Sequence, residues 1–187
     1  ARCVLNLRYL RSLGTLHISA PMHQDVLRYM NKINGLHTII FDETNTKDEH
    51  LRQLRPPATL RTLNLKDKFI TDKGLKYIAK CTGLTSLTLA GTEVTGSGLV
   101  HIASLTGLTH LSLRELSIEP AYWALVTKHT NLTSLDVSHS SIDDTTLFAL
   151  SGLTKLTRLE LMGSTITASG LAAFSNLRGL TALTLSA

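Results

Sequence analysis

The frame Leu-x-x-Leu-x-Leu recurs along the chain at an almost constant interval. When Ile, Val or Phe is allowed in place of Leu, copies begin at Leu13, Leu36, Leu60, Leu84, Leu108, Leu132, Leu156 and Leu180. Successive starts are 24 residues apart, except that Leu13 and Leu36 are 23 residues apart. A fixed period of this length indicates a solenoid, in which each unit packs against its two neighbours.

The copy at residues 84–89 shows what each unit is expected to form. In a strand, its leucines at 87 and 89 point to one face, and Ser86 and Thr88 point to the other. Parallel strands lie about 4.8 Å apart, whereas a helix is about 10 Å across. We therefore expect a curved stack that carries the strands on its inner face.

A turn follows each strand and repeats one polar position. This position holds Thr44, Lys68, Thr92, Leu116, Ser140 and Ser164 in successive units. Thr and Ser hydroxyls can bond to backbone groups of the turn, but a leucine side chain cannot. We therefore expect the ladder of turn hydrogen bonds to be broken at Leu116.

A short helix is expected after each turn. Its first residues favour caps at Thr71, Thr95 and Thr167, and Thr46 opens a capping-box pattern. Pro56 and Pro57 are expected to cut the second helix to about one or two turns. The helices are expected to bury Leu75, Ile78, Leu99, Ile102, Trp123, Val126, Leu147, Leu150, Leu171 and Phe174.

This arrangement of strand frame, polar turn residue, apolar residue and Gly-Leu helix start resembles the leucine-rich repeat family, in its 24-residue intracellular type. The resemblance implies fold class α/β. It implies a right-handed β/α solenoid, the leucine-rich repeat horseshoe, with eight short parallel strands on the concave face and short helices on the convex face. Members of this type commonly bind protein partners, sometimes as the recruiting arm of a ubiquitin ligase.

The repeats are expected to form one solenoid over residues 1–187, with about seven full units and partial terminal ones. Val4, Leu7 and Leu10 align with Leu171, Phe174 and Leu177, so the chain is expected to begin inside a helix. It ends directly after a strand. Since terminal units of solenoids need polar caps, we expect this sequence to be an excerpt of a longer array.

The two cysteines, Cys3 and Cys81, lie in different repeats and are expected to be free thiols. Extracellular members of the family carry clustered cysteines in their caps, so the resemblance favours a reducing, intracellular and most simply cytoplasmic location. No run approaches the roughly 20 apolar residues that span a bilayer, and we expect no membrane insertion.

Charge is distributed unevenly. Residues 1–80 hold 14 Lys and Arg against 7 acidic residues, and residues 81–187 hold 5 against 7. The first part is therefore about +7 and the second about −2. This asymmetry leaves open nucleic-acid or acidic-partner binding through the basic half, or simply a solvated convex face. Because the lysines are not interleaved with aromatic residues, nucleic acid is the less favoured partner.

No sequence motif indicates catalysis, a metal site or a cofactor. The glycine spacing at 91–98 imitates a phosphate loop but lacks its lysine, and the histidines are scattered. Ser, His and Asp side chains share the inner face, but an open sheet supplies no oxyanion hole. We expect a non-enzymatic chain without cofactors.

The inner face is the expected partner-binding surface, because outward positions of adjacent strands form one polar sheet surface there. The predicted contact residues are Arg61, Asn64, Lys66, His110, Ser112, Arg114, Asp136, Ser138, His139, Arg158, Glu160 and Met162. Ile40 and Phe69 are possible apolar anchors beside them. The hypothesis is an interaction scaffold for a protein partner. A purely structural spacer is the alternative from another class, and the oligomeric state stays open.

Overall fold

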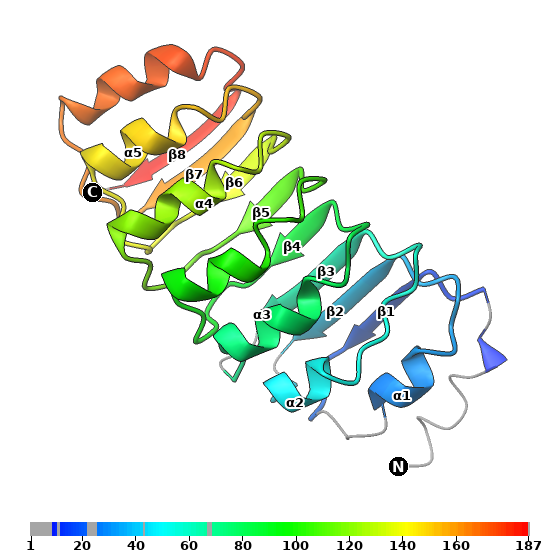
Figure 1. Cartoon of the computed structure of the whole chain (residues 1–187). Helices are drawn as coiled ribbons and strands as arrows, with labels where there is room; N and C mark the ends of the chain where they lie inside the picture. Colours follow the sequence, from blue (N-terminus) through cyan, green and yellow to red (C-terminus); the bar gives the residue numbers. More distant parts are fainter. Residues whose placement is uncertain (1–8, 11, 22–25, 43, 67–68, 187) are drawn as a thin grey trace.

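The computed structural model describes residues 9–10, 12–21, 26–42, 44–66 and 69–186. All eight strands form one parallel sheet in the order β1 to β8, so every strand pairs with its neighbours in sequence (Figure 1). Their bounds are β1 Thr15–Ile18, β2 Thr38–Asp42, β3 Thr62–Lys66, β4 Ser86–Thr88, β5 His110–Ser112, β6 Ser134–Asp136, β7 Arg158–Met162 and β8 Ala182–Ser186.

The pairing register confirms the register predicted from the leucine frame. Leu87 pairs with Leu63 on one side and Leu111 on the other, and each of these side chains is at most 3% exposed. The short first interval does not disturb the sheet, because Thr15 pairs with Thr38 in the same register as later strands. Equivalent leucines therefore stack into continuous ladders, and burial of their apolar area is the main favourable term.

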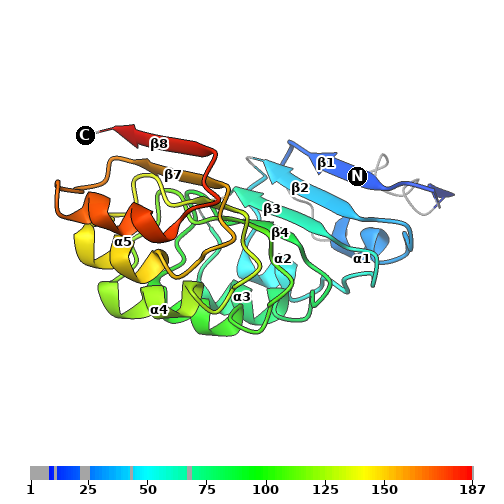
Figure 2. The same cartoon turned by 90° about the horizontal axis from the view of Figure 1, so that it is seen from above.

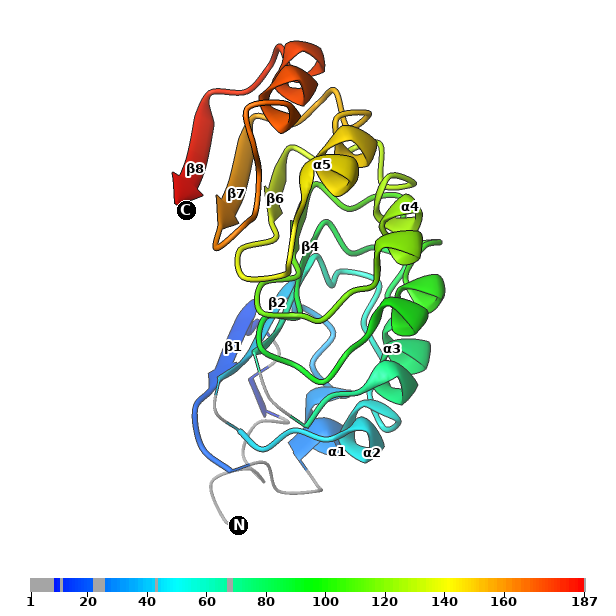
Figure 3. The ribbon, with the colours of Figure 1, turned by 90° about the vertical axis from the view of Figure 1, so that its left-hand side faces the viewer.

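The helices all lie behind one face of the sheet (Figure 2). In Figure 3 the sheet bows away from its free face, so the strands line the concave side, as expected. The helical elements are α1 Val26–Met30, α2 Asp48–Leu51, α3 Asp72–Ile78, η2 Gly96–His101, η3 Pro120–Tyr122, α4 Trp123–Val126, α5 Asp144–Leu150 and η4 Gly170–Asn176. The four-residue α2 confirms the shortening predicted from Pro56 and Pro57.

An aspartate at the start of one helix binds the threonine that precedes the next helix; we call this arrangement the Asp–Thr clamp. Asp72 Oδ1 accepts a hydrogen bond from Thr95 N at 2.8 Å, and Asp72 Oδ2 accepts one from Thr95 Oγ1 at 2.8 Å. The same pairs of bonds join Asp48 to Thr71 and Asp144 to Thr167. The clamps tie successive helices together along the convex side.

The clamps change the roles predicted for the threonines. Thr71 caps α3 by accepting a hydrogen bond from Lys73 N, as predicted. The Thr95 side chain makes no cap bond to the helix backbone; its hydroxyl donates to Asp72 and lies 3.1 Å from Ser97 Oγ. Before α2 the cap falls on Lys47 rather than Thr46, whose hydroxyl lies buried against that of Thr44.

The turn ladder is continuous at Leu116, contrary to the prediction. The Ser140 hydroxyl of the following repeat donates to Leu113 O at 2.7 Å and accepts a hydrogen bond from Leu116 N at 3.3 Å. The hydroxyl of the next repeat thus makes the hydrogen bonds that Leu116 cannot make in its own turn. Leu116 itself joins the core and is only 2% exposed.

The predicted helix core is buried except in η4. There Leu171 is 49% exposed and Phe174 is half-buried, and η4 turns Gly170 and Ala173 inward instead. Cys81 is a buried free thiol, and desolvation raises its pKa to about 12. Predictions made for Cys3, Val4, Leu7 and Lys68 lie outside the described residues. Within the described part of the chain, no helix is long and apolar enough to cross a membrane.

Candidate functional site

Outward side chains of neighbouring strands form rows across the concave face. The register aligns His110 with Ser134 and Arg158 in one row. It aligns Ser112 with Asp136 and Glu160 in the next. The sheet therefore holds polar side chains at fixed strand spacing, about 4.8 Å from one strand to the next.

A hollow of about 720 Å³ lies on this face, where the carboxyl ends of β2 to β6 meet the following turns. We call it the concave hollow. It is lined by Asp42, Asn45, Lys66, Phe69, Thr88, Ala90, Gly91, Ser112, Arg114, Glu115 and Asp136. Its volume falls within the range of about 300–1,000 Å³ typical of ligand pockets.

Small residues of the fourth repeat lie at the middle of the concave hollow. Ala90 occupies the position that Lys66 and Arg114 hold in the neighbouring repeats, and Gly91 occupies the position of Glu115. Thr88 lines the hollow with them. The fourth repeat thereby leaves the space of the hollow open, and the adjacent repeats contribute its charged side chains. Phe69 adds the main apolar surface, since its side chain is 45% exposed.

Hydrogen bonds hold the acidic side of the hollow in place. Asp136 Oδ2 accepts from Ser112 Oγ at 3.1 Å, and Asp136 Oδ1 accepts from Ser138 N at 3.0 Å. In the turn after the neighbouring strand β5, Arg114 Nε donates to Glu115 Oε1 at 2.9 Å in a solvent-exposed ion pair. Asp136 is therefore fixed before any partner arrives, which lowers the entropic cost of binding.

Several non-glycine residues take left-handed backbone conformations in the turns after the strands, among them Asn45 and Glu115, which line the hollow. Glu115 has φ of 61° and His139 has φ of 58°, at the position where Gly91 and Gly163 occur in the flanking repeats. Such conformations cost residues with a Cβ roughly 1 kcal/mol and concentrate at functional sites. The turns after β5 and β6 thus carry side chains where glycine would be more stable, and of these two residues Glu115 lines the hollow.

The structure brings four of the predicted contact residues together in the concave hollow: Lys66, Ser112, Arg114 and Asp136. Asn64, His110, Arg158, Glu160 and Met162 lie on the same face but outside the hollow. His139 is exposed beside Gly163, in the turn after β6. Ile40 is half-buried on β2.

One predicted contact residue needs correction. Ser138 is fully buried, and its hydroxyl accepts a hydrogen bond from Met162 N at 3.3 Å, so it cannot meet a partner. Arg61 is exposed just before β3 and does not line the concave hollow. Its Nη1 donates to Ala58 O at 2.8 Å and to Leu60 O at 3.0 Å, because the guanidinium closes the loop before the strand.

Asp42, Asn45 and Glu115 line the concave hollow but escaped the sequence prediction. Asp42 is the outward residue at the end of β2, in register with Lys66, so the strand frame contained the necessary signal. Asn45 and Glu115 lie in turns with positive φ, where the alternation of a strand no longer tells which way a side chain points. Among the described residues, no three His, Cys, Asp or Glu side chains gather as metal ligands.

Comparison with known proteins agrees with this architecture. Residues 130–187 match the family described as Leucine rich repeat. No curated protein matches the chain in sequence. Among solved structures, internalin C2 from Listeria monocytogenes aligns with a TM-score of 0.74 and 20% identity, over 96% of this chain and 74% of that chain.

Two further structures share the fold. An internalin, inlF, from Listeria monocytogenes has a TM-score of 0.53 and 17% identity over 97% of this chain and 63% of its own. TLR13 in the TLR13–ssRNA13 complex has a TM-score of 0.63 and 17% identity over 98% of this chain and 31% of its own. With eight strands in the register of the leucine frame, and with a family match over residues 130–187, the chain has the leucine-rich repeat fold.

Proposed function

We propose that this chain is a non-catalytic interaction scaffold that binds a protein partner through its concave face. The observation that carries the proposal is the concave hollow, in which exposed Phe69 lies among charges of both signs. An aromatic anchor surrounded by polar groups is typical of the residues that dominate protein–protein binding energy.

The charges of the hollow indicate the chemistry of the partner. Lys66 and Arg114 are cationic, whereas Asp42, Glu115 and Asp136 are acidic. A partner segment that fits would present an apolar side chain to Phe69 and charges of both signs to this rim, which favours specificity over raw affinity. His110, Arg158, Glu160 and Met162 are proposed as the periphery of the same contact surface.

Nucleic acid is a poorer fit to this face. Three carboxylates in the hollow would repel phosphates, and Phe69 is the one aromatic side chain that lines it. The likeness to TLR13, which was solved as a complex with ssRNA13, concerns the fold and does not carry that ligand to this chain. The buried free thiol of Cys81 supports the further proposal of a reducing compartment.

Affinity capture with matched variants tests the proposal. The variant Lys66→Glu/Arg114→Glu reverses both cations of the hollow, and Lys73→Glu/Lys76→Glu makes the same charge change on the exposed surface of α3. We expect to capture a partner protein whose recovery falls at least about tenfold with Lys66→Glu/Arg114→Glu but not with the α3 control. A tenfold loss of affinity is equivalent to about 1.4 kcal/mol. That partner is then titrated as a pure protein.

Arg158→Glu separates the hollow from the rest of the concave face, because Arg158 lies outside it. We expect this variant to weaken binding less than Arg114→Glu does. If charge reversal in the hollow and alanine substitutions across the concave face leave every capture unchanged, the proposal is wrong and a spacer role gains support.

A further inference from the structure

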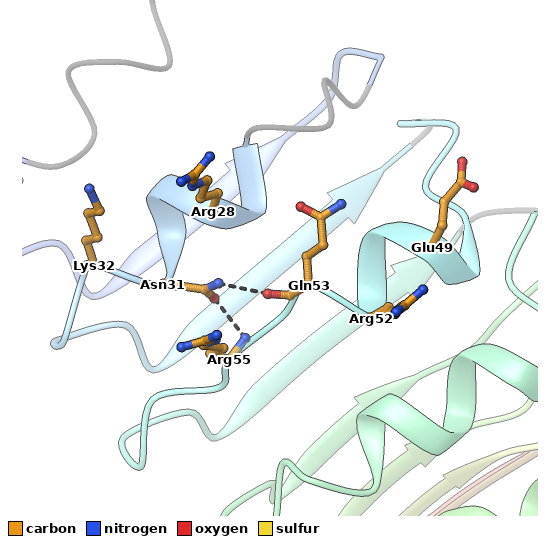
Figure 4. Close-up of a pocket in the computed structure, with 7 residues that line it drawn as sticks. All are labelled: Arg28, Asn31, Lys32, Glu49, Arg52, Gln53 and Arg55. Carbon is orange, nitrogen blue, oxygen red and sulfur yellow. Dashed lines mark hydrogen bonds between the residues drawn. The ribbon is translucent and has the colours of Figure 1, made fainter.

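A second surface, on the convex side, has a different charge character. A groove of about 760 Å³ lies between α1 and the residues that follow α2. We call it the convex groove. Its cationic side chains are Arg28, Lys32, Arg52 and Arg55, and Glu49 is the one acidic residue in its lining (Figure 4).

The groove exists because α2 ends early. Arg55 precedes Pro56, which disfavours helical backbone at Arg55, and α2 has four residues where α3 and α5 have seven. The chain after Leu51 therefore turns down beside α1 instead of completing another helical turn. This leaves an open space between the two units.

Asn31 fixes the two walls of the groove relative to each other. Its Nδ2 donates to Gln53 O at 2.8 Å, and its Oδ1 accepts a hydrogen bond from Arg55 N at 2.8 Å. Figure 4 shows both bonds crossing from the end of α1 to the segment after α2. The backbone that carries Arg52 and Arg55 is thus held at a set position beside Arg28 and Lys32.

The four cations have no anionic partner among the described residues, where the ion pair of Arg114 with Glu115 is the one observed. All four side chains are exposed. The four positive charges repel one another in the groove, and no salt bridge among the described residues offsets this repulsion. An anionic ligand would relieve that repulsion, and three of the four cations are arginines, which bind carboxylates bidentately.

We propose that the convex groove binds an acidic peptide segment of a protein partner, independently of the concave face. Neighbouring helices are about 10 Å apart, which matches about three residues of extended chain. Acidic residues at that spacing would reach the α1 pair and the Arg52–Arg55 pair together. Between them, a neutral residue would avoid Glu49, and the exposed Gln53 amide can bond to the peptide backbone.

A nucleic-acid strand fits the groove less well. No aromatic side chain lines it for base stacking, and a continuous phosphate backbone cannot omit a charge opposite Glu49. The experiment therefore compares both ligands. A fluorescent peptide with the repeating unit Glu-Ser-Ser, its Gln-Ser-Ser analogue and a single-stranded thymidine oligonucleotide of equal length are titrated with the full chain by anisotropy.

We expect the Glu-Ser-Ser peptide to bind and the Gln-Ser-Ser peptide not to bind. Arg52→Glu/Arg55→Glu should lower the peptide affinity at least about tenfold, and Lys73→Glu/Lys76→Glu, with the same net charge change, should lower it less than about twofold. Circular dichroism melting curves establish that both variants fold. Asn31→Ala keeps the net charge, so a severalfold loss of affinity in this variant would come from groove geometry.

Three results would overturn the inference. The first is no binding of the acidic peptide by the wild-type chain. The second is equal weakening by the α3 control, which would reduce the effect to overall charge. The third is that the oligonucleotide binds more tightly than the Glu-Ser-Ser peptide and that Arg52→Glu/Arg55→Glu lowers the oligonucleotide affinity to the same extent. That result would make the groove a phosphate-backbone site.

Discussion

The ring of Tyr122 lies so close over Gly96 that a Cβ atom on Gly96 would be only 2.6 Å from Tyr122 Cγ. In the neighbouring repeats the pair is an aspartate and a glycine: Cβ atoms on Gly98 and Gly170 would lie 2.7 Å from Asp72 Cγ and Asp144 Cγ. Between the fourth and fifth repeats the two positions are therefore exchanged, with Gly96 at the position of the aspartate and Tyr122 at the position of the glycine. This junction loses the Asp–Thr clamp and replaces it with aromatic packing.

This packing predicts a strongly coupled pair. Gly96→Ala should destabilise the chain by about 1–3 kcal/mol, because the added methyl group overpacks the contact with Tyr122. In a Tyr122→Ala background the same change should be nearly neutral, since the remaining close neighbour is the flexible end of Glu119. Urea unfolding of the four proteins gives the coupling energy.

Gly152→Ala is the matched control, because the nearest atom to a Cβ there is Ala149 O at an ordinary 3.6 Å. It should change stability by less than about 0.5 kcal/mol. Additive effects of the Gly96 and Tyr122 substitutions would show that the close approach is not energetically important.

The Asp–Thr clamp predicts a loss of stability in acid. Burial alone would raise the pKa of Asp72, but hydrogen bonds from Ser97 and Thr95, with the charge of His101, bring it below its usual value of 3.8. The folded state therefore releases the proton more readily than the unfolded chain. The stabilisation is complete above the unfolded pKa and is lost as pH falls through the folded pKa.

The variant Asp72→Asn should be less stable than wild type at pH 7, and this difference should shrink as pH falls below about 4. Chemical denaturation at a series of pH values measures it. A difference that is unchanged at the acidic end would mean that the charge of Asp72 contributes nothing to the clamp.

His129 predicts a second pH effect, nearer neutrality. The side chain fills the position of Leu105 and Leu153, and burial lowers its pKa although its Nδ1–H donates to Leu105 O at 3.2 Å. The unfolded chain takes up a proton below its ordinary pKa of about 6.5, while the folded chain stays neutral to lower pH. Stability should therefore fall as pH drops below about 6.5.

His129→Leu should remove this part of the pH dependence, because leucine already fits the site in the adjacent repeats. Free energies of unfolding at pH 7.5 and pH 5 are compared for the two proteins. An equally large drop in His129→Leu would assign the effect to other groups.

The architecture could be predicted because it rests on a local rule. The leucine frame fixes which side chains point inward, and a constant period then stacks Leu63, Leu87 and Leu111 without further information. The turn at Leu116 shows the limit of this rule. Its missing hydroxyl is supplied by Ser140, one repeat later, and a frame applied to each unit separately cannot find such an exchange.

The candidate site was harder to predict, because a hollow forms where a repeat lacks the large side chains of its neighbours. Ala90 and Gly91 match no binding pattern in the sequence, yet their small size opens the space that Lys66 and Arg114 surround. The clamp, in contrast, left a readable signal: Asp48, Asp72 and Asp144 are each followed by a threonine 23 residues later. A comparison of residues 23 positions apart, one fewer than the repeat period, therefore shows the clamp pairs in the sequence.

The left-handed turns at Glu115 and His139 lead to the final prediction, that stability and binding can be separated. Glycine at either position relieves a strained backbone, so His139→Gly should stabilise the chain by up to about 1 kcal/mol. Glu115→Gly should gain less, because it also removes the ion pair with Arg114. Only Glu115 lines the concave hollow, so only its substitution should weaken binding of the captured partner. Thermal unfolding and titration of the two variants decide this, and a partner that binds Glu115→Gly as well as wild type would remove that carboxylate from the proposed contact.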